Sequence, residues 1–118
     1  MKTPEQIKED LMQFTGTTTY FKHPFNIKFT DGVKYLADEC QCYWLIDLVA
    51  SYQFDKKVKR EDFQVYKLKV NPDKSAIVEI SDGNENIIVT QELEFTDFPL
   101  EEIMLWFSNG VCYLPSEH

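Results

Sequence analysis

The C-terminal 43 residues of this chain contain no lysine or arginine. All 12 basic side chains lie before residue 75, whereas residues 76–118 carry nine of the 20 acidic ones, and the formal net charge is −8. A balance of this sign disfavours binding to nucleic-acid backbones through charge alone. It predicts an acidic C-terminal half that either forms a solvated surface or binds a protein partner with a basic surface.

Glycine and long apolar runs are scarce as well. The glycines are isolated from one another, so no glycine-rich loop for a phosphate group is present: they are Gly16, Gly32, Gly83 and Gly110. No apolar run approaches the roughly 18 residues that a membrane-spanning helix requires. No basic and then apolar leader opens the chain. We therefore expect a cytoplasmic protein with reduced thiols and no membrane contact.

The few cysteines do not form a recognisable metal or catalytic motif. Cys40 and Cys42 are spaced C-x-C rather than C-x₂-C, and Cys112 is distant in the sequence. On one helix, residues i and i+2 point about 200° apart, which works against a shared metal even with His23 nearby. We expect the cysteines to pack as small apolar side chains. The sequence predicts no catalytic residue, no metal and no cofactor.

Apolar and aromatic side chains are numerous enough for a single core. They make up 43% and 14% of the 118 residues, which favours one domain spanning residues 1–118. Near the start, Thr3 and Gln6 form a capping box for a short helix over residues 1–14, and Pro4 suits its first helical position. The conformation of residues 15–29 has two possible interpretations, an edge strand around residues 17–21 or an ordered loop. Residues 17–21 have the composition of a strand, and His-Pro at 23–24 forces an extended or turn conformation.

The densest apolar segment lies within residues 30–54. Thr30 or Asp31 is a candidate helix N-cap, and apolar residues recur behind it at helical spacing. The run from Cys42 to Phe54 is apolar around most of a helical circumference, as in a buried helix. Whether this stretch forms one bent helix or two is open. The basic cluster behind it, at residues 56–60, is flanked by acids and favours a solvated loop over direct nucleic-acid contact.

From Phe63 the apolar period changes from 3.6 to 2. Three alternating runs separated by turns at 71–74 and 81–84 predict an antiparallel meander, with Lys67 and Lys69 near Glu79. The tail fits a helix over residues 100–107 or a hairpin around Asn109-Gly110, and we favour the hairpin. The predicted fold is therefore α+β, with N-terminal helices packed on one face of an antiparallel sheet of about five strands.

Two groups of side chains are candidate binding residues. Asp47 interrupts the apolar run, and we expect it to be buried and satisfied by Tyr43 and Ser51, at i−4 and i+4. Alternatively it lines a cleft between residues 15–29 and the central helix, where a small molecule binds or reacts; the other residues of that cleft are Tyr20, His23 and Asp31. The second group is Glu92 and Glu94, the candidate binding residues on the acidic C-terminal half.

Five sequence blocks resemble a known family: TGTTTYFKHP (15–24), FTDGVKYLADE (29–39), YWLID (43–47), TDFPL (96–100) and LPSE (114–117). Together they resemble a family of small uncharacterised bacterial proteins, a domain of unknown function often encoded near mobile-element genes. The resemblance implies one full-length domain, a tail hairpin and the bacterial cytoplasm. It carries no established activity, so no functional residue is transferred from it.

These observations favour a small non-enzymatic protein that binds another protein through its acidic C-terminal half. The alternative is the ligand-binding or catalytic cleft described above. A third hypothesis is a homodimer joined through exposed edge strands or the uncharged tail hairpin.

Overall fold

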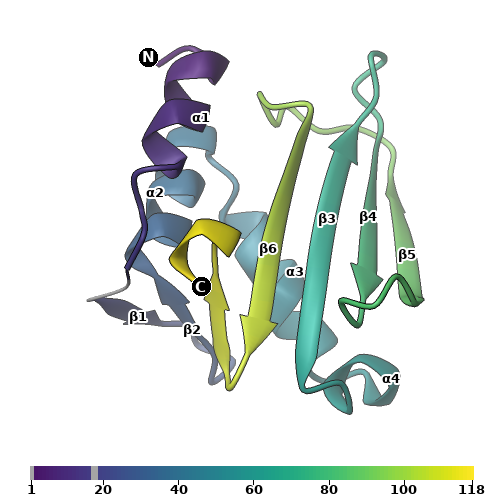
Figure 1. Ribbon diagram of the computed structural model, residues 1–118. Helices are drawn as coiled ribbons and strands as arrows, with labels where there is room; N and C mark the ends of the chain where they lie inside the picture. Colours follow the sequence, from purple (N-terminus) through teal and green to yellow (C-terminus); the bar gives the residue numbers. More distant parts are fainter. Residues whose placement is uncertain (1, 17–18) are drawn as a thin grey trace.

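The computed structural model describes residues 2–16 and 19–118, and within them seven strands form one mixed sheet (Figure 1). The strand order is β1-β2-β7-β6-β3-β4-β5. The helices are α1 (Pro4–Leu11), α2 (Asp31–Cys40), α3 (Tyr43–Tyr52) and α4 (Lys56–Lys59), and a 3₁₀ helix spans Pro115–Glu117. The strands are β1 (Tyr20–Lys22), β2 (Lys28–Thr30), β3 (Phe63–Val70), β4 (Ala76–Ser81), β5 (Ile87–Leu93), β6 (Glu102–Ser108) and β7 (Val111–Tyr113). The α+β prediction is confirmed.

The capping box at the start of α1 is confirmed. Thr3 Oγ accepts a hydrogen bond from the Gln6 backbone N–H at 3.2 Å, and Gln6 Oε1 accepts one from Thr3 N–H at 2.9 Å. These bonds satisfy backbone donors that an isolated helix end leaves open. Ile7 and Leu11 form the buried side of the helix, which packs against α2.

Residues 31–54 form two helices, which settles the question that the sequence left open. Thr30 caps α2, because its Oγ accepts from Val33 N–H at 3.2 Å. The helix ends where Gln41 adopts a left-handed backbone conformation with φ 51°. Cys42 then precedes α3 and donates its N–H to Ala37 O at 3.0 Å. The chain therefore turns between the two helices, and α3 has its own orientation over the sheet.

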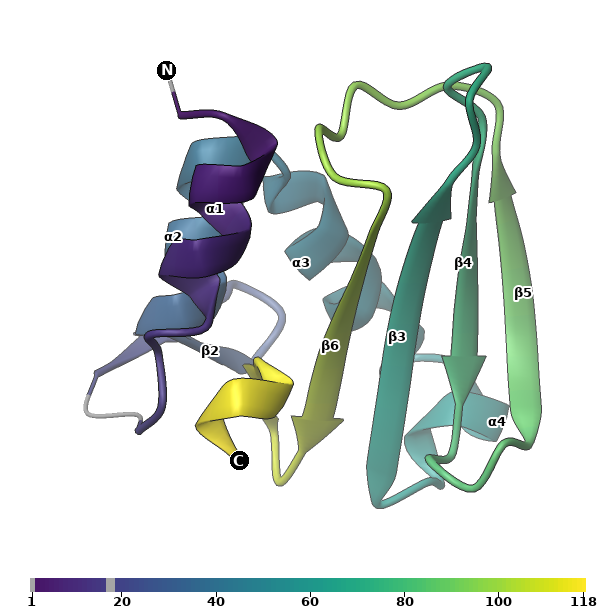
Figure 2. The same cartoon turned by 45° about the horizontal axis from the view of Figure 1, so that its top comes forward.

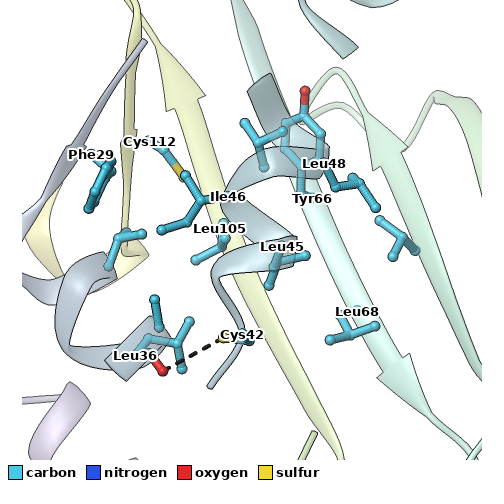
Figure 3. Close-up of a cluster of buried hydrophobic side chains, with 14 of the residues drawn as sticks. Phe29, Leu36, Cys42, Leu45, Ile46, Leu48, Tyr66, Leu68, Leu105 and Cys112 are labelled. Atoms are coloured by element: carbon cyan, nitrogen blue, oxygen red, sulfur yellow. Dashed lines mark hydrogen bonds between the residues drawn. The ribbon is translucent and has the colours of Figure 1, made fainter. Parts of the chain in front are cut away.

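The core lies between these helices and one face of the sheet (Figure 3). Side chains from α3 meet the inward side chains of β3 and β6, and Cys112 of β7 extends this layer toward Phe29. The labelled members are Phe29, Leu36, Cys42, Leu45, Ile46, Leu48, Tyr66, Leu68, Leu105 and Cys112. All of them are buried, so the predicted packing of helices on the apolar sheet face is confirmed.

The predicted meander and tail hairpin are both present. Strands β3, β4 and β5 pair antiparallel, with Lys67 opposite Glu79, and the Lys69 ammonium lies 2.9 Å from the Glu79 carboxylate. Strands β6 and β7 pair antiparallel through Asn109-Gly110, which have φ values of 52° and 75°. Positive φ at both turn residues is the requirement of the tight hairpin that Asn-Gly favours.

The prediction of about five antiparallel strands is wrong in two respects. Residues 20–30 supply two further strands, β1 and β2, and β2 pairs parallel to β7, with Lys28 opposite Val111. Each added strand has only three residues, which is too short for an alternating pattern to emerge in the sequence. Of the two alternatives left open near residues 17–21, an edge strand or an ordered loop, the structure shows a strand that begins at Tyr20, while Thr17 and Thr18 lie outside the described residues.

The two tail strands carry little charge because β6 lies inside the sheet and aromatic rings gather on its outer side. Trp106 meets Phe63, Tyr113 and His118 edge to face, with ring centroids 5.3, 6.1 and 5.2 Å away. The inner side of β6 faces the core through Leu105. In the described part of the chain, no helix has the length and apolar character to cross a membrane.

A buried contact joins the C-terminus to the start of α2. The Thr30 hydroxyl donates to Glu117 Oε1 at 2.7 Å, and Leu114 N–H donates to the same oxygen at 2.9 Å. A carboxylate at a helix N-terminus is favoured by the helix dipole. The contact also requires Gly32, because a Cβ at that position would lie 2.8 Å from Glu117 Oε1.

Replacement of Thr30 by alanine tests this contact. The substitution removes a helix cap and a hydrogen bond to a buried carboxylate, so we expect it to lower the free energy of unfolding by about 2–3 kcal/mol. Thr3→Ala removes only the exposed cap of α1, and the expected loss is about 1 kcal/mol. Urea unfolding measures both. Thr30→Ser keeps the hydroxyl and should retain most of the free energy of unfolding. Equal losses in Thr30→Ala and Thr3→Ala, or a loss in Thr30→Ser as large as that in Thr30→Ala, would contradict the structural role of the contact.

Candidate functional site

The loop between β1 and β2, residues 23–27, is fastened to α3 by a histidine side chain. Within the loop, His23 N–H donates to Ile27 O at 2.8 Å and Asn26 N–H donates to His23 O at 3.1 Å. Asn26 adopts a positive φ of 67°, which asparagine tolerates better than most residues. The His23 side chain is only 9% exposed. The loop is thus folded tightly around this ring.

Both nitrogens of the His23 ring are engaged. Phe25 N–H donates to Nδ1 at 3.1 Å, so the proton of the neutral ring is on Nε2, which donates to Asp47 Oδ1 at 2.6 Å. A histidine that acts as a general base needs a free nitrogen within reach of the substrate. Because this ring has none, the geometry favours a structural role for the His23–Asp47 pair, which holds the loop against α3.

The prediction that Asp47 is a buried carboxylate is wrong. Its side chain is 66% exposed, because α3 is apolar on one side only and Tyr43, Asp47 and Ser51 form its solvent-facing stripe. The two predicted donors bond elsewhere. The Tyr43 hydroxyl donates to Asp38, and the Ser51 hydroxyl donates to Leu48 O at 2.8 Å. Of the alternative, a cleft lined by Asp47 with His23 and Tyr20 nearby, the structure shows only the contact between Asp47 and His23.

Tyr20 and Asp31 make contacts elsewhere in the fold and not with this pair. Tyr20 is on β1 opposite Thr30, 53% exposed, and lines a different hollow with Tyr113 and His118. Asp31 opens α2, and its carboxylate accepts the N–H of Gly32 at 3.1 Å. Of the four residues predicted to line one cleft, the structure brings only His23 and Asp47 together.

All three cysteines are free and buried, as predicted. Cys40 and Cys42 do interact, contrary to the expectation for one continuous helix, because the chain turns between them. The Cys40 thiol and burial both raise the pKa of Cys42, and burial raises the pKa of Cys112 to about 12. The neutral, buried thiols of Cys42 and Cys112 are therefore poor nucleophiles. Within residues 2–16 and 19–118, no three His, Cys, Asp or Glu side chains are grouped as metal ligands.

The sequence did not indicate a hollow that lies next to the His23 loop. Its volume is about 490 Å³, and it lies between this loop, the end of α3, Lys59 of α4 and the β6–β7 turn. Its lining includes Phe25, Phe54 and Phe107. Phe25 and Phe54 each lie within a turn. Only the tertiary fold brings these two turns together.

Glu92 and Glu94 lie at one end of the sheet, next to the segment that leads from β5 to β6. We call residues 94–101 the acidic loop, because Glu94, Asp97 and Glu101 are exposed and it contains no basic residue. Figure 2 shows it crossing the ends of β3 and β4. Phe95, in the same loop, is 72% exposed.

Buried side chains fix the acidic loop in place. Thr96, Phe98 and Leu100 are buried, whereas the residues between them face outward. Thr96 N–H donates to Lys74 O at 2.8 Å, and Val70 N–H donates to Glu101 O at 2.8 Å. The loop is therefore attached at both ends to the β3–β4 connection, and its acidic and aromatic side chains stand on an ordered backbone.

A family profile described as a family of unknown function (DUF6876) matches residues 5–118. The chain belongs to that family. This match confirms the resemblance to a family of unknown function and covers the His23 loop, the hollow and the acidic loop alike. No curated protein and no solved structure matches the chain.

The proton position on His23 is directly measurable. If the ring holds the loop as described, long-range nitrogen NMR correlations at pH 8 will show the Nε2–H tautomer, because Nδ1 accepts the Phe25 N–H. In an Asp47→Ala variant the tautomer preference weakens, whereas Asp38→Ala leaves it unchanged. An Nδ1–H tautomer, or an averaged signal in the unsubstituted protein, would contradict this role.

Proposed function

We propose that the protein acts by binding another protein, and that the acidic loop with the neighbouring ends of the sheet is its contact surface. The observation that carries the proposal is Phe95, which is 72% exposed within a segment rich in acids. Aromatic residues are enriched as anchors at protein interfaces. Phe95 also borders a hollow of about 300 Å³ with Trp44, Leu93, Thr96 and Asp97, which would receive an apolar side chain of the partner.

The charge of this surface indicates a basic partner. Of the acids near it, Glu79 pairs with Lys69 at 2.9 Å and Glu102 lies 3.9 Å from Lys67. The four others have no ion pair within the described residues: Glu92, Glu94, Asp97 and Glu101. Charges left free at a surface steer a partner of opposite sign and raise its rate of association.

The ordered backbone of the acidic loop supports binding as well. A flexible loop loses conformational entropy when it binds, at a cost of about 0.5–1.5 kcal/mol for each side chain that becomes fixed. Here the alternation of buried and exposed residues between 95 and 101 holds the backbone before a partner arrives. The exposed aromatic and acidic groups therefore form a prearranged surface.

The setting that we propose is the bacterial cytoplasm, and for a protein encoded near mobile elements the partner is a nucleic-acid-handling protein with a basic groove. Direct contact with nucleic acid does not fit the proposal, because the contact surface is acidic. Self-association through edge strands stays a prediction; β1 and β5 are the two outer strands of the sheet.

Affinity capture with the full chain tests the proposal. With the immobilised protein in a lysate of its source cells, we expect a basic protein to be retained at about 0.1 M salt and released by about 0.5 M, because screening weakens contacts between exposed charges. Phe95→Ala and the double variant Glu92→Gln, Glu94→Gln should each reduce retention at least about tenfold. Quantitative mass spectrometry measures the retained protein.

Two matched variants serve as controls. Glu85→Gln removes an exposed acid outside the acidic loop, and Phe54→Ala removes an exposed ring on another surface. Both should retain the partner fully. The proposal would be contradicted if retention did not depend on salt concentration, if the control variants lost as much retention as the test variants, or if no specific protein were retained.

A further inference from the structure

The hollow beside the His23 loop has the form of a small-molecule site. Ile27 and Phe107 are buried and form an apolar floor. Phe25, 50% exposed, and Phe54, 73% exposed, stand beside it with their rings edge to face and centroids 5.7 Å apart. A volume of about 490 Å³ lies within the roughly 300–1,000 Å³ typical of ligand pockets, which combine apolar walls with a few polar groups.

The backbone around the hollow is held from three sides. The His23–Asp47 hydrogen bond attaches the loop to α3, and Lys28 N–H donates to Gly110 O at 2.8 Å, which attaches the loop to the β6–β7 turn. On the third side, Gln53 donates to Gln64 Oε1 and to the Tyr66 hydroxyl, both at 2.9 Å, and so joins the end of α3 to β3. The hollow therefore has fixed walls before any ligand enters.

Two exposed rings that meet at the edge of a hollow differ from isolated surface aromatics. Single exposed apolar residues are ordinary on soluble proteins. Here the loop is hydrogen-bonded throughout, yet its Phe25 side chain remains half exposed and touches Phe54 rather than the core. An aromatic ligand placed against them would gain stacking or edge-to-face contacts in addition to the burial of apolar area.

The charge at the hollow is positive. Lys59 contributes to its lining and has no ion pair within the described residues. It belongs to α4, whose four residues include three lysines, and Arg60 follows. Asn26 adds a neutral amide to the lining. An open hollow lined by aromatic rings and one free ammonium group is complementary to a ligand with an aromatic body and one negative charge.

We propose that this hollow binds a small aromatic carboxylate, whose ring lies against Phe25, Phe54 and the Ile27–Phe107 floor and whose carboxylate pairs with Lys59. The site is separate from the acidic loop and does not depend on the protein-binding function. Neither Glu92 nor Glu94 lines it.

NMR titration of the full chain with naphthoate, and with its neutral amide naphthamide, tests this site. We expect saturable shifts of the amide signals of residues 25–27, Lys59 and Gly110 at up to millimolar naphthoate, and binding of naphthamide about tenfold weaker. Phe54→Ala should weaken naphthoate binding at least about tenfold. Lys59→Gln should weaken naphthoate about tenfold and leave naphthamide unchanged.

The controls separate a specific site from general surface attraction. Lys57→Gln removes a neighbouring cation that does not line the hollow, and Phe95→Ala removes an exposed ring elsewhere, so both should bind naphthoate as the unsubstituted protein does. Phe54 and Lys59 are exposed, and the dispersion of the NMR spectrum verifies that their variants fold. No saturable shift, equal binding of naphthoate and naphthamide, or equal losses in the Lys57 and Lys59 variants would overturn the proposal.

Discussion

The parallel pairing of β2 with β7 is the contact on which the arrangement of this molecule depends. It joins residues 20–30 to the C-terminal hairpin, with Phe29 paired to Cys112 on the neighbouring strand. The pairing places the His23 loop against the Asn109-Gly110 turn, which creates the aromatic hollow. It also places Thr30 where its hydroxyl reaches Glu117, so that the start of α2 and the chain terminus support each other.

The two candidate surfaces share one physical design, in which an exposed aromatic side chain stands on a backbone that hydrogen bonds hold in place. Phe25 follows this design in the His23 loop, and Phe95 follows it in the acidic loop. Their electrostatic settings are opposite, with a free lysine at one and free carboxylates at the other. Such surfaces bind without large losses of conformational entropy. The His23 ring, with both nitrogens hydrogen-bonded, helps to hold one of these two backbones in place.

Local patterns in the sequence predicted the elements that local interactions determine. The Thr3 capping box, the Thr30 cap, the meander and the Asn-Gly hairpin each depend on residues close together in the chain. The sequence left β1 open between a strand and a loop and did not indicate β2, because three residues carry no periodicity. A parallel pair between residues 28–29 and 111–112 leaves no local signal. Asp47 is exposed, contrary to the prediction, because it lies with Tyr43 and Ser51 on the solvent-facing stripe of α3. The His23–Asp47 contact was part of the alternative in which Asp47 lines a cleft, and no local pattern indicates the hollow.

Hydrogen exchange of single backbone amides in the full chain, followed by NMR, tests most directly the claim that both aromatic loops are held rigid. The reference is Glu85 N–H, in an exposed turn, for which no acceptor is found among the described residues. The account predicts that Lys28 N–H and Thr96 N–H, bonded to Gly110 O and Lys74 O, exchange at least about 100-fold more slowly than Glu85 N–H. Exchange of all three amides at the same rate would contradict it, because both phenylalanines would then stand on flexible loops.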